Sequence, residues 1–490
     1  METFASLMES LNGFVWGPPM MILLLGVGAF LTVGLRFISI LKIRYGFRQL
    51  FKKRSGEADA GDVSPFAALM TALSSTVGTG NIAGVAAAIA IGGPGAVFWM
   101  WVTAVLGTAT KFGEGVLAVR YREIDANGNR VGGPMYYIKN GLGPKFMWLA
   151  VAFAIFGMIG SLSTGNAVQA NSIADALKSA YNFDPRIVAV ILSVVVAGVV
   201  FGGIKRIGAV ASRLVPFMAL LYISAALVVI AANIAHVPAA FGLIFKGAFG
   251  LQGAGTGVTI GLMMLAMQKG VARGLFSNEA GQGSAPIAHA AAQNNDPVNQ
   301  GIIAMLGTII DTLIICTITA LVILTSGVMS ADCLASPAIL SLLESGATPP
   351  GCEIGVPLTA AAFDATLVGF GEHIVTLCLV IFAFTTIIGW SYYGERCAAF
   401  LFKEKSIPIF RVFWILAVFV STFALSFETG DDNLVVATFW LIADSLTGLM
   451  AAPNLIALIL LSPVVMKLAK EYFDKEKIAN DGLIDQDDLK

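Results

Sequence analysis

Long apolar runs alternate with short polar segments along the chain, and eleven of these runs are long enough to cross a lipid bilayer. A transmembrane helix needs about 20 mainly apolar residues. Several runs exceed about 25 residues, which predicts tilted, kinked or interrupted helices. The runs lie near residues 17–40, 65–91, 95–119, 146–175, 186–204, 207–232, 257–292, 301–327, 372–400, 409–427 and 434–467. The pattern predicts an all-α polytopic membrane protein with eleven transmembrane helices.

Two of these runs are interrupted by glycines and small polar residues. The first interruption covers Ser74–Asn81 and the second covers Phe276–Ser284. Because hydrocarbon offers no hydrogen bonds, a break in a transmembrane helix is tolerated only where it lines a cavity within the protein. Paired breaks in corresponding halves of a chain indicate a substrate and ion site near the bilayer midplane. The pattern therefore favours a secondary transporter.

With the first run set aside, the remaining ten divide into two groups of five, and an interrupted run opens each group. Because five is odd, the two groups have opposite topology, which is the inverted-repeat arrangement. The predicted parts are an extra helix with a cytoplasmic loop (1–64), a first repeat (65–232), an external connection (233–256), a second repeat (257–467) with an external loop (330–371), and a cytoplasmic tail (468–490).

Basic residues are unevenly distributed between the loops on the two sides of the membrane. Alternate loops and the tail hold the basic clusters, which are Lys42–Arg54, Arg120–Lys145, Lys205–Arg213, Arg396–Arg411 and Lys467–Lys490. The opposite side offers only Lys178, Arg186 and Lys246. Since cytoplasmic loops carry the excess of Lys and Arg, we expect the N-terminus outside the cell and the C-terminus in the cytoplasm.

Composition agrees with a membrane protein, because 57% of the 490 residues are hydrophobic and 12% are charged, against about 25% charged in soluble domains. Glu2 and Glu9 precede the first apolar run with no basic residue before it, so we expect a retained helix and no cleaved signal. Cys333 and Cys352 share the external loop, where a disulfide and two free thiols are both consistent with the sequence. The sequence contains no nucleotide-binding or hydrolase motif, which argues against an ATP-driven protein or an enzyme; no nucleic-acid partner is expected.

The first break offers backbone amides and carbonyls together with the side-chain oxygens of Thr76, Thr79 and Asn81. Half-helix N-termini attract a carboxylate, while unwound carbonyls suit a small hard cation such as Na⁺. Gly78 and Gly80 permit unusual backbone angles and the close approach of a ligand. Tight helix packing also uses small residues, but packing does not explain why threonine, glycine and asparagine occur together. We interpret this break as a ligand site.

The second break contains Glu279 next to Ser277 and Asn278. A carboxylate at membrane depth is costly and is a functional-site hypothesis by default. Glu279 is consistent with pairing to a ligand ammonium, assisting a cation or titrating. It is equally consistent with capping its own broken helix or pairing with Arg273. We therefore place Ser277 and Asn278 ahead of Glu279 as site residues.

Three polar residues lie inside other apolar runs. Lys111 and Glu114 are spaced i, i+3, which predicts a structural ion pair within one helix. Gln169 falls midway along the fourth run, where an amide serves either helix association or a ligand.

The ninth run contains the adjacent Thr385 and Thr386, which together offer two hydroxyls to a cation. Trp390 lies one helical turn beyond Thr386 on the same face. An indole facing a cavity would limit the size of a bound side chain. The alternative is ordinary packing, with the threonine hydroxyls bonded to i−4 carbonyls.

Seven segments in order along nearly the whole chain resemble the alanine or glycine:cation symporter family of bacterial and archaeal amino-acid transporters. The segments are GTGNIAGVA (Gly78–Ala86), GGPGAVFWMW (Gly92–Trp101), GGPMYYI (Gly132–Ile138), GGIKRIG (Gly202–Gly208), RGLFSNEAGQGSAP (Arg273–Pro286), DT (Asp311–Thr312) and GWSYYGE (Gly389–Glu395). The resemblance implies eleven helices with a leucine-transporter-like core of five plus five inverted helices. It also implies Na⁺-coupled uptake of alanine or glycine.

The stretch VGTGN (Val77–Asn81) resembles the VGLGN-type stretch of sodium-coupled neurotransmitter transporter homologues. That likeness implies carboxylate contacts at Thr79 and Gly80, one sodium position near Thr76 and Asn81, and another formed by the Ser74 and Val77 carbonyls with Thr385 and Thr386. The complete predicted substrate set is Thr79, Gly80, Gln169, Ser277, Asn278, Thr386 and Trp390, and the predicted sodium set is Ser74, Thr76, Val77, Asn81, Thr385 and Thr386.

These observations lead us to expect a Na⁺-driven symporter of alanine and glycine that works by alternating access. We expect a monomer in the plasma membrane of a bacterium or archaeon, surrounded by lipid and without an organic cofactor. The alternative within transport is a proton-coupled carrier or exchanger on the same fold, with Glu279 as the titrating group. A nutrient sensor, which binds an amino acid without net flux, is a further alternative.

Overall fold

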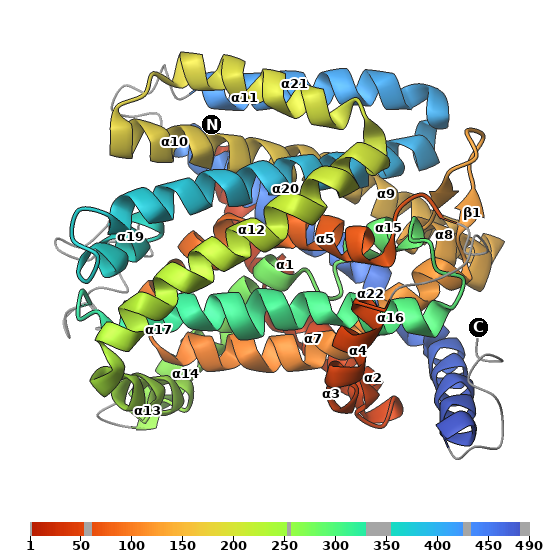
Figure 1. Ribbon diagram of the computed structural model, residues 1–490, viewed down its shortest axis with the longest axis horizontal. Coiled ribbons are helices and arrows are strands. Elements are labelled where there is room, and N and C mark those ends of the chain that lie inside the picture. Colours follow the sequence, from red (N-terminus) through yellow and green to blue (C-terminus); the bar gives the residue numbers. More distant parts are fainter. Residues whose placement is uncertain (1, 53–60, 252–255, 330–353, 425–432, 481–490) are drawn as a thin grey trace.

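The computed structural model describes residues 2–52, 61–251, 256–329, 354–424 and 433–480. Figure 1 shows the long helices side by side, with α8, β1 and the C-terminus at one end of the molecule and α13 and α19 at the other. Eight helices of the described ranges are long and apolar enough to cross a membrane, or nine if one bent pair counts as a single span. The fold is therefore a polytopic helical bundle, as predicted.

The N-terminal half contains α1 (Glu2–Val15), α2 (Pro18–Gly34), α3 (Ile38–Leu41), α4 (Ile43–Leu50), α5 (Pro65–Thr76), η1 (Gly80–Gly84), α6 (Val85–Gly92), α7 (Gly95–Arg120), β1 (Glu123–Ile124), β2 (Arg130–Val131), α8 (Pro134–Tyr137), η2 (Ile138–Leu142), η3 (Pro144–Phe146), α9 (Met147–Leu162), η4 (Ser163–Ala167), α10 (Val168–Tyr181), α11 (Pro185–Val200), α12 (Gly203–Ala232), η5 (Ile234–His236) and α13 (Val237–Ala248).

The C-terminal half contains α14 (Thr256–Asn278), α15 (Ala285–Ala290), α16 (Pro297–Thr308), η6 (Ile309–Cys316), α17 (Thr317–Thr325), α19 (Val356–Asp364), α20 (Gly371–Phe402), η8 (Glu404–Ser406), α21 (Ile407–Ala424) and α22 (Asn433–Asn480). The segments η1, η2, η4 and η6 are π-helical. Residues Cys333 and Cys352 lie outside the described ranges.

The first span differs from the predicted 17–40. It runs from Ser6 to Gly34 and ends where Arg36 and Phe37 adopt left-handed backbone angles, with φ of 53° and 61°. Such angles cannot continue a right-handed helix. The residues beyond Gly34 instead form the short helices α3 and α4, so apolar composition placed both the start and the end of this span too far along the chain.

Both interrupted runs are broken helices, as predicted, and they pack against each other in a crossed manner. The α5 and η1–α6 pair bends by 55°, and α14 is separated from α15 by the non-helical stretch 279–284. Helix α5 contacts α15, while α6 and η1 contact α14. The half before one break therefore lies beside the half after the other, which is the pairing that an inverted repeat produces.

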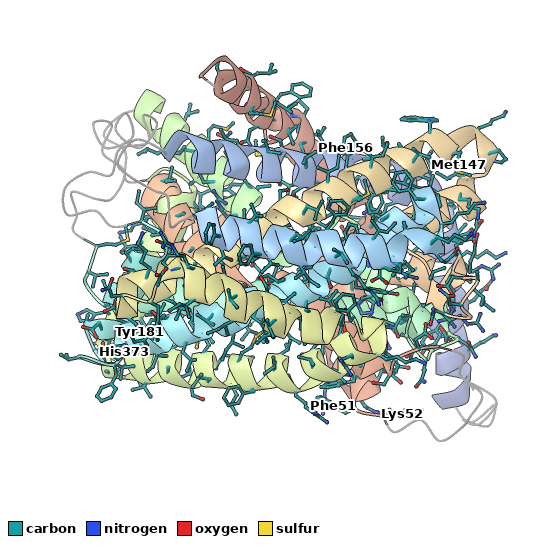
Figure 2. The ribbon with its side chains drawn as sticks, turned by 90° about the horizontal axis from the view of Figure 1, so that it is seen from above. Phe51, Lys52, Met147, Phe156, Tyr181 and His373 are labelled. Atoms are coloured by element: carbon teal, nitrogen blue, oxygen red, sulfur yellow. The ribbon has the colours of Figure 1, made fainter. Side chains whose placement is uncertain are left out.

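One long span next to these breaks crosses the whole bundle. Helices α9 and α10, joined by η4, form one span from Pro144 to Tyr181, and Figure 2 shows Met147 and Tyr181 at opposite ends of the molecule. At the second end, the rings of Tyr181 and His373 stack with centroids 5.3 Å apart. The α10 part packs against α20. The span formed by α9, η4 and α10 therefore extends from one end of the bundle to the other.

Outward-facing surfaces of the peripheral helices are strongly apolar. On α11 the exposed residues include Ile187, Val190, Ile191 and Val194, and α12 and α21 expose similar large side chains. A soluble monomer rarely exposes contiguous apolar surface of this extent. These helix faces are therefore suited to contact lipid.

The end that carries β1 and β2 is closed by a set of paired groups that we call the clasp, formed by residues 61–63, 122–131, 290–293 and 395–396. Val63 forms a parallel bridge with Ala292, directly joining the chain before α5 to the chain after α15. Arg122 donates to the Ala292 carbonyl at 2.8 Å. Burial opposes ionisation of Asp125, but hydrogen bonds from Asn129 and Arg396 hold its pKa below the usual range.

Candidate functional site

The α5 helix loosens before the first break because its last hydroxyl side chains compete for backbone carbonyls. Ser74, Ser75 and Thr76 donate to carbonyls of the preceding turn at 2.8, 3.1 and 2.7 Å. Such bonding back to the preceding turn weakens and often bends a helix. Val77 then adopts an extended conformation with ψ of 97°. The predicted sodium residues Ser74, Thr76 and Val77 therefore lie together at this turn.

Gly78 lies at the centre of the first break, against α20 and α10. Its N–H donates to Asn81 Oδ1 at 2.9 Å, so the asparagine replaces a missing helical acceptor. A Cβ on Gly78 would lie 2.6 Å from Thr386 Oγ1 and 3.4 Å from Gln169 Oε1. Only glycine permits this approach. The break thus brings together Thr386 and Gln169, which are far apart in the sequence.

Two buried polar atoms beside the first break have no hydrogen-bond partner in the described protein. They are Thr79 Oγ1 and Gln169 Oε1, on side chains that are only 3% exposed. The Gln169 amide nitrogen is held by the Thr164 carbonyl at 3.2 Å, which fixes how its oxygen points. Since buried polar groups are normally paired, these two atoms mark a place where a polar ligand would be stabilised.

The second break is held by unusual backbone angles and by the Glu279 carboxylate. Glu279 itself has a left-handed φ of 54°, as do Gly281 and Gly283 with 87° and 84°. Its carboxylate accepts the Ser284 hydroxyl and the Trp390 indole N–H at 3.0 Å. Strained non-glycine residues persist only where their surroundings hold them. Among the bonds and ion pairs of the described ranges, Glu279 neither caps a backbone amide of its own helix nor pairs with Arg273. Its carboxylate instead holds two side chains.

A second buried carboxylate, Glu114 of α7, also supports this break. Glu114 Oε1 accepts the Gly283 N–H at 3.1 Å and Asn454 Nδ2 at 2.7 Å. The Asn454 amide also donates to the Gly281 carbonyl at 2.9 Å. The predicted Lys111–Glu114 ion pair does not form within the described structure, because Glu114 points to the break and serves as acceptor for its free backbone amide.

Asp311 is the functional candidate that our sequence reasoning missed. It is fully buried on η6, and its carboxylate accepts Asn81 Nδ2, Ser277 Oγ and Thr312 Oγ1, each at 2.7 Å. Asn81 belongs to the first break and Ser277 to the end of α14, so this one side chain joins both breaks. The rule that intramembrane carboxylates are functional candidates could have found it.

The remaining residues predicted for the second break lie around this carboxylate. Asn278 accepts the Ala280 N–H at 2.9 Å and donates to Thr312 Oγ1 at 3.1 Å. A Cβ on Gly80 would lie 3.5 Å from the Ser277 Cα, so Gly80 faces the second break. Both ends of the Asn278 amide are thus bonded within the protein.

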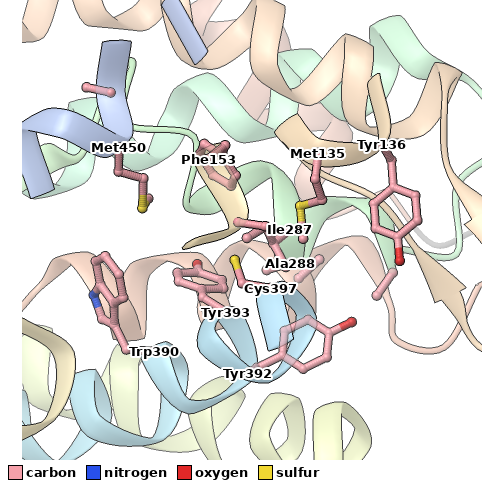
Figure 3. Packing of buried hydrophobic residues seen from close by; sticks show 14 of the residues in the cluster. Met135, Tyr136, Phe153, Ile287, Ala288, Trp390, Tyr392, Tyr393, Cys397 and Met450 are labelled. Atoms are coloured by element: carbon pink, nitrogen blue, oxygen red, sulfur yellow. The ribbon is translucent and has the colours of Figure 1, made fainter. Parts of the chain in front are cut away.

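Trp390 lies between η4 and the second break, buried on α20. A Cβ on Gly165 would lie 2.3 Å from the indole, which shows how closely η4 approaches it. Figure 3 shows Trp390 beside Tyr393 on α20 and opposite Met450, and the two rings meet edge to face with centroids 5.6 Å apart. The indole is therefore fixed on several sides, and its N–H is bound to Glu279.

The two adjacent threonines of α20 point in different directions. Thr386 Oγ1 lies 3.4 Å from the Val77 carbonyl, whereas Thr385 Oγ1 lies 3.6 Å from Met218 Sδ. Both hydroxyls also donate to the Phe382 carbonyl. The oxygens of Val77 and Thr386 fit a hard cation, since such ions prefer hydroxyl and carbonyl ligands. Ser74 lies against the same helix, because a Cβ on Gly389 would approach Ser74 Oγ to 2.8 Å.

Known proteins match this chain over nearly its whole length. A model of the sodium:alanine symporter family matches residues 1–486. The chain is 47% identical over 476 residues to the sodium/alanine symporter AgcS of Methanococcus maripaludis, covering 97% of this chain and 98% of that protein. It is 38% identical over 481 residues to YrbD of Bacillus subtilis, whose name describes a sodium/proton-dependent alanine carrier, covering 98% and 95%.

A solved structure with a similar fold is that of MhsT in complex with L-phenylalanine. The TM-score is 0.50 at 12% identity, over 84% of this chain and 98% of that one. Two crossed broken helices and this similarity show a leucine-transporter-like fold. The chain belongs to the sodium:alanine symporter family. It is an amino-acid:cation symporter and not an enzyme, which confirms the class that the sequence predicted.

Proposed function

We propose that this protein carries alanine and glycine into the cell together with Na⁺ by alternating access. The observation that supports this most strongly is the first break, where Thr79 Oγ1 and Gln169 Oε1 are buried without partners. They lie beside the carbonyl and hydroxyl pair of Val77 and Thr386. A zwitterionic ligand and a cation need this combination of polar groups within one small site.

The amino-acid carboxylate binds at the first break, next to Thr79 and Gly80. The N-terminal end of η1 and α6 presents a positive dipole there. Gln169 Oε1 accepts a hydrogen bond from the ligand's ammonium group. Ser277 and Asn278 form the opposite wall, and Trp390 limits the side chain. The indole is fixed by Gly165 and Glu279, so it cannot easily move to make room for a larger ligand. This favours a substrate whose side chain is a hydrogen atom or a methyl group.

Na⁺ binds at the first break through the carbonyls of Ser74 and Val77 and the Thr386 hydroxyl, with Thr385 as a weaker contributor. A second Na⁺ position lies near Thr76 and Asn81. Carbonyl and hydroxyl oxygens suit Na⁺ and are poor ligands for soft metals. These assignments are supported by the 3.4 Å approach of Thr386 Oγ1 to the Val77 carbonyl.

Alternating access follows from opening of the clasp, where the Val63–Ala292 bridge joins the ends of α5 and α15. Separating these two half-helices would expose both breaks to that side. The excess of basic residues at the clasp end favours a cytoplasmic location for it. The protein would then lie in a prokaryotic plasma membrane with its N-terminus outside, acting as a monomer.

Proton coupling is the second candidate, because Glu114, Glu279 and Asp311 are all buried carboxylates. The discriminating experiment measures uptake of radiolabelled alanine into proteoliposomes. An inward Na⁺ gradient at equal pH should drive accumulation, whereas an inward proton gradient in choline should not. Accumulation driven by the proton gradient alone would reject Na⁺ coupling. Competition by unlabelled glycine, but not leucine, tests the substrate assignment in the same vesicles.

A further inference from the structure

The buried acidic groups fall into two kinds, because Glu114, Glu279 and Asp311 take part in none of the ion pairs of the described ranges, whereas others are paired with arginine. Asp125 and Glu395 both have an arginine partner, at 3.1 and 2.7 Å. Asp311 takes part in none of the ion pairs of the described ranges. Its direct partners are an amide and two hydroxyls, which carry no net charge. The buried Lys111 acts on Asp311 electrostatically, but it forms no ion pair with it among those of the described ranges. A buried carboxylate with so little direct compensation is costly.

The groups around Asp311 are those that bind hard cations. Ser277 and Thr312 offer hydroxyl oxygens, and hydroxyls that now donate to the carboxylate can turn their lone pairs towards a cation. The Asn81 oxygen faces Gly78 N–H at 2.9 Å, so the amide remains attached to the first break. The carboxylate lies on the π-helical segment η6, and π-helical turns are frequent at functional sites.

We propose that Asp311 is the anionic ligand of a Na⁺ held between the two breaks, and that this charge lets the ion bind before the amino acid. The inference rests on the proposed sodium coupling and adds a ligand and a binding order to it. If the substrate carboxylate supplied the negative charge of the Na⁺ site, the substrate would have to bind before the ion. Here the protein supplies the negative charge itself, through a residue joined to Asn81 and Ser277 by 2.7 Å hydrogen bonds.

The test follows thermal unfolding of the purified full-length protein in detergent, without amino acid, while NaCl replaces choline chloride at constant ionic strength. Wild-type protein should be stabilised by Na⁺ alone, because a ligand that binds only the folded state raises its stability. Asp311→Asn keeps the shape and removes the charge. It should raise the half-saturating Na⁺ concentration at least ~10-fold, since the attraction of unit charges at short range exceeds one tenfold step in affinity.

Ser277→Ala is the matched variant, because it removes a neutral group of the same cluster and leaves the charge. It should shift the half-saturating Na⁺ concentration by about 2- to 10-fold, and it gives a second reading if Asp311→Asn is too unstable to purify. An unchanged Na⁺ response in Asp311→Asn, or in Ser277→Ala when that is the measurable variant, would overturn the proposal. Wild-type protein that shows Na⁺-driven uptake but no Na⁺ stabilisation without alanine would overturn the binding order alone. Absence of Na⁺-driven uptake would reject the proposed function itself.

Discussion

The two breaks differ in the groups that hold their backbone. At the second break, Glu279 and Glu114 accept hydrogen bonds from Ser284, Trp390 and the Gly283 amide. At the first, Thr79 Oγ1 and the nearby Gln169 Oε1 have no partner in the described protein. The second break is therefore braced by two carboxylates, although both amide atoms of its Gln282 are buried without a partner in the described protein. The first break has no such brace, and we propose that its unpartnered oxygens serve a ligand. Position in the repeat does not fix the role of a break; its hydrogen-bond partners do.

The largest effect is expected at the brace of the second break. Glu114→Ala leaves the Gly283 N–H without its acceptor and opens a cavity, which we expect to cost about 2–5 kcal/mol of stability. Thermal unfolding in detergent would show it as a lowered midpoint. Glu372→Ala, at an exposed carboxylate on α20, is the control and should change stability by less than about 0.5 kcal/mol. Equal midpoints for the two variants would mean that the second break is not braced by Glu114.

The opposite behaviour is expected at the first break. Thr79→Val removes a hydroxyl that has no protein partner, so the unfolding midpoint should stay close to that of wild type. Alanine affinity should fall by about 10- to 100-fold, because a hydrogen bond to a charged ligand group contributes about 1.5–3 kcal/mol. Equilibrium binding of radiolabelled alanine measures this. A destabilised variant with normal affinity would reverse the roles that we assign to the two breaks.

Trp390 is bonded to Glu279 of the second break and is also the proposed limit on substrate size. Its variants therefore separate the bracing of the second break from the selection of the substrate. Trp390→Phe removes the N–H that Glu279 accepts and keeps a smaller aromatic ring in place. It should lower stability by about 1–3 kcal/mol while largely keeping the proposed preference for glycine and alanine. Trp390→Ala should also admit larger side chains, since forcing them into a filled pocket costs about 1–3 kcal/mol. Competition by valine and leucine provides the measurement. An unchanged substrate ranking in Trp390→Ala would show that the indole does not line the pocket.

The smallest effect is expected on the Na⁺ dependence of uptake, and it should differ between Thr385 and Thr386. Thr386→Val should raise the Na⁺ concentration for half-maximal uptake by about 3- to 10-fold, the loss of a hydrogen-bond-sized interaction. Thr385→Val should have less effect because its hydroxyl is directed to Met218, and the double variant should exceed either. Sodium activation that is normal in the double variant would remove both residues from the proposed sodium site.

The sequence predicted the position of both breaks because an interruption of a long apolar run is a local signal. It did not predict the partner of Glu279, because Trp390 lies 111 residues further along. The proposed Lys111–Glu114 pair was wrong because helical spacing does not reveal a free backbone amide on another helix. Asp311 was overlooked since its run has no break, although its charge inside that run was visible.

The central claim is that the two breaks form one site in which Na⁺ and the amino acid stabilise each other. The most direct test measures alanine affinity at increasing Na⁺ and Na⁺ affinity at increasing alanine, on the same purified protein. Coupling between two sites is reciprocal, so we predict that each ligand tightens the other by the same factor. An alanine affinity that does not change between choline and saturating Na⁺ would contradict the account.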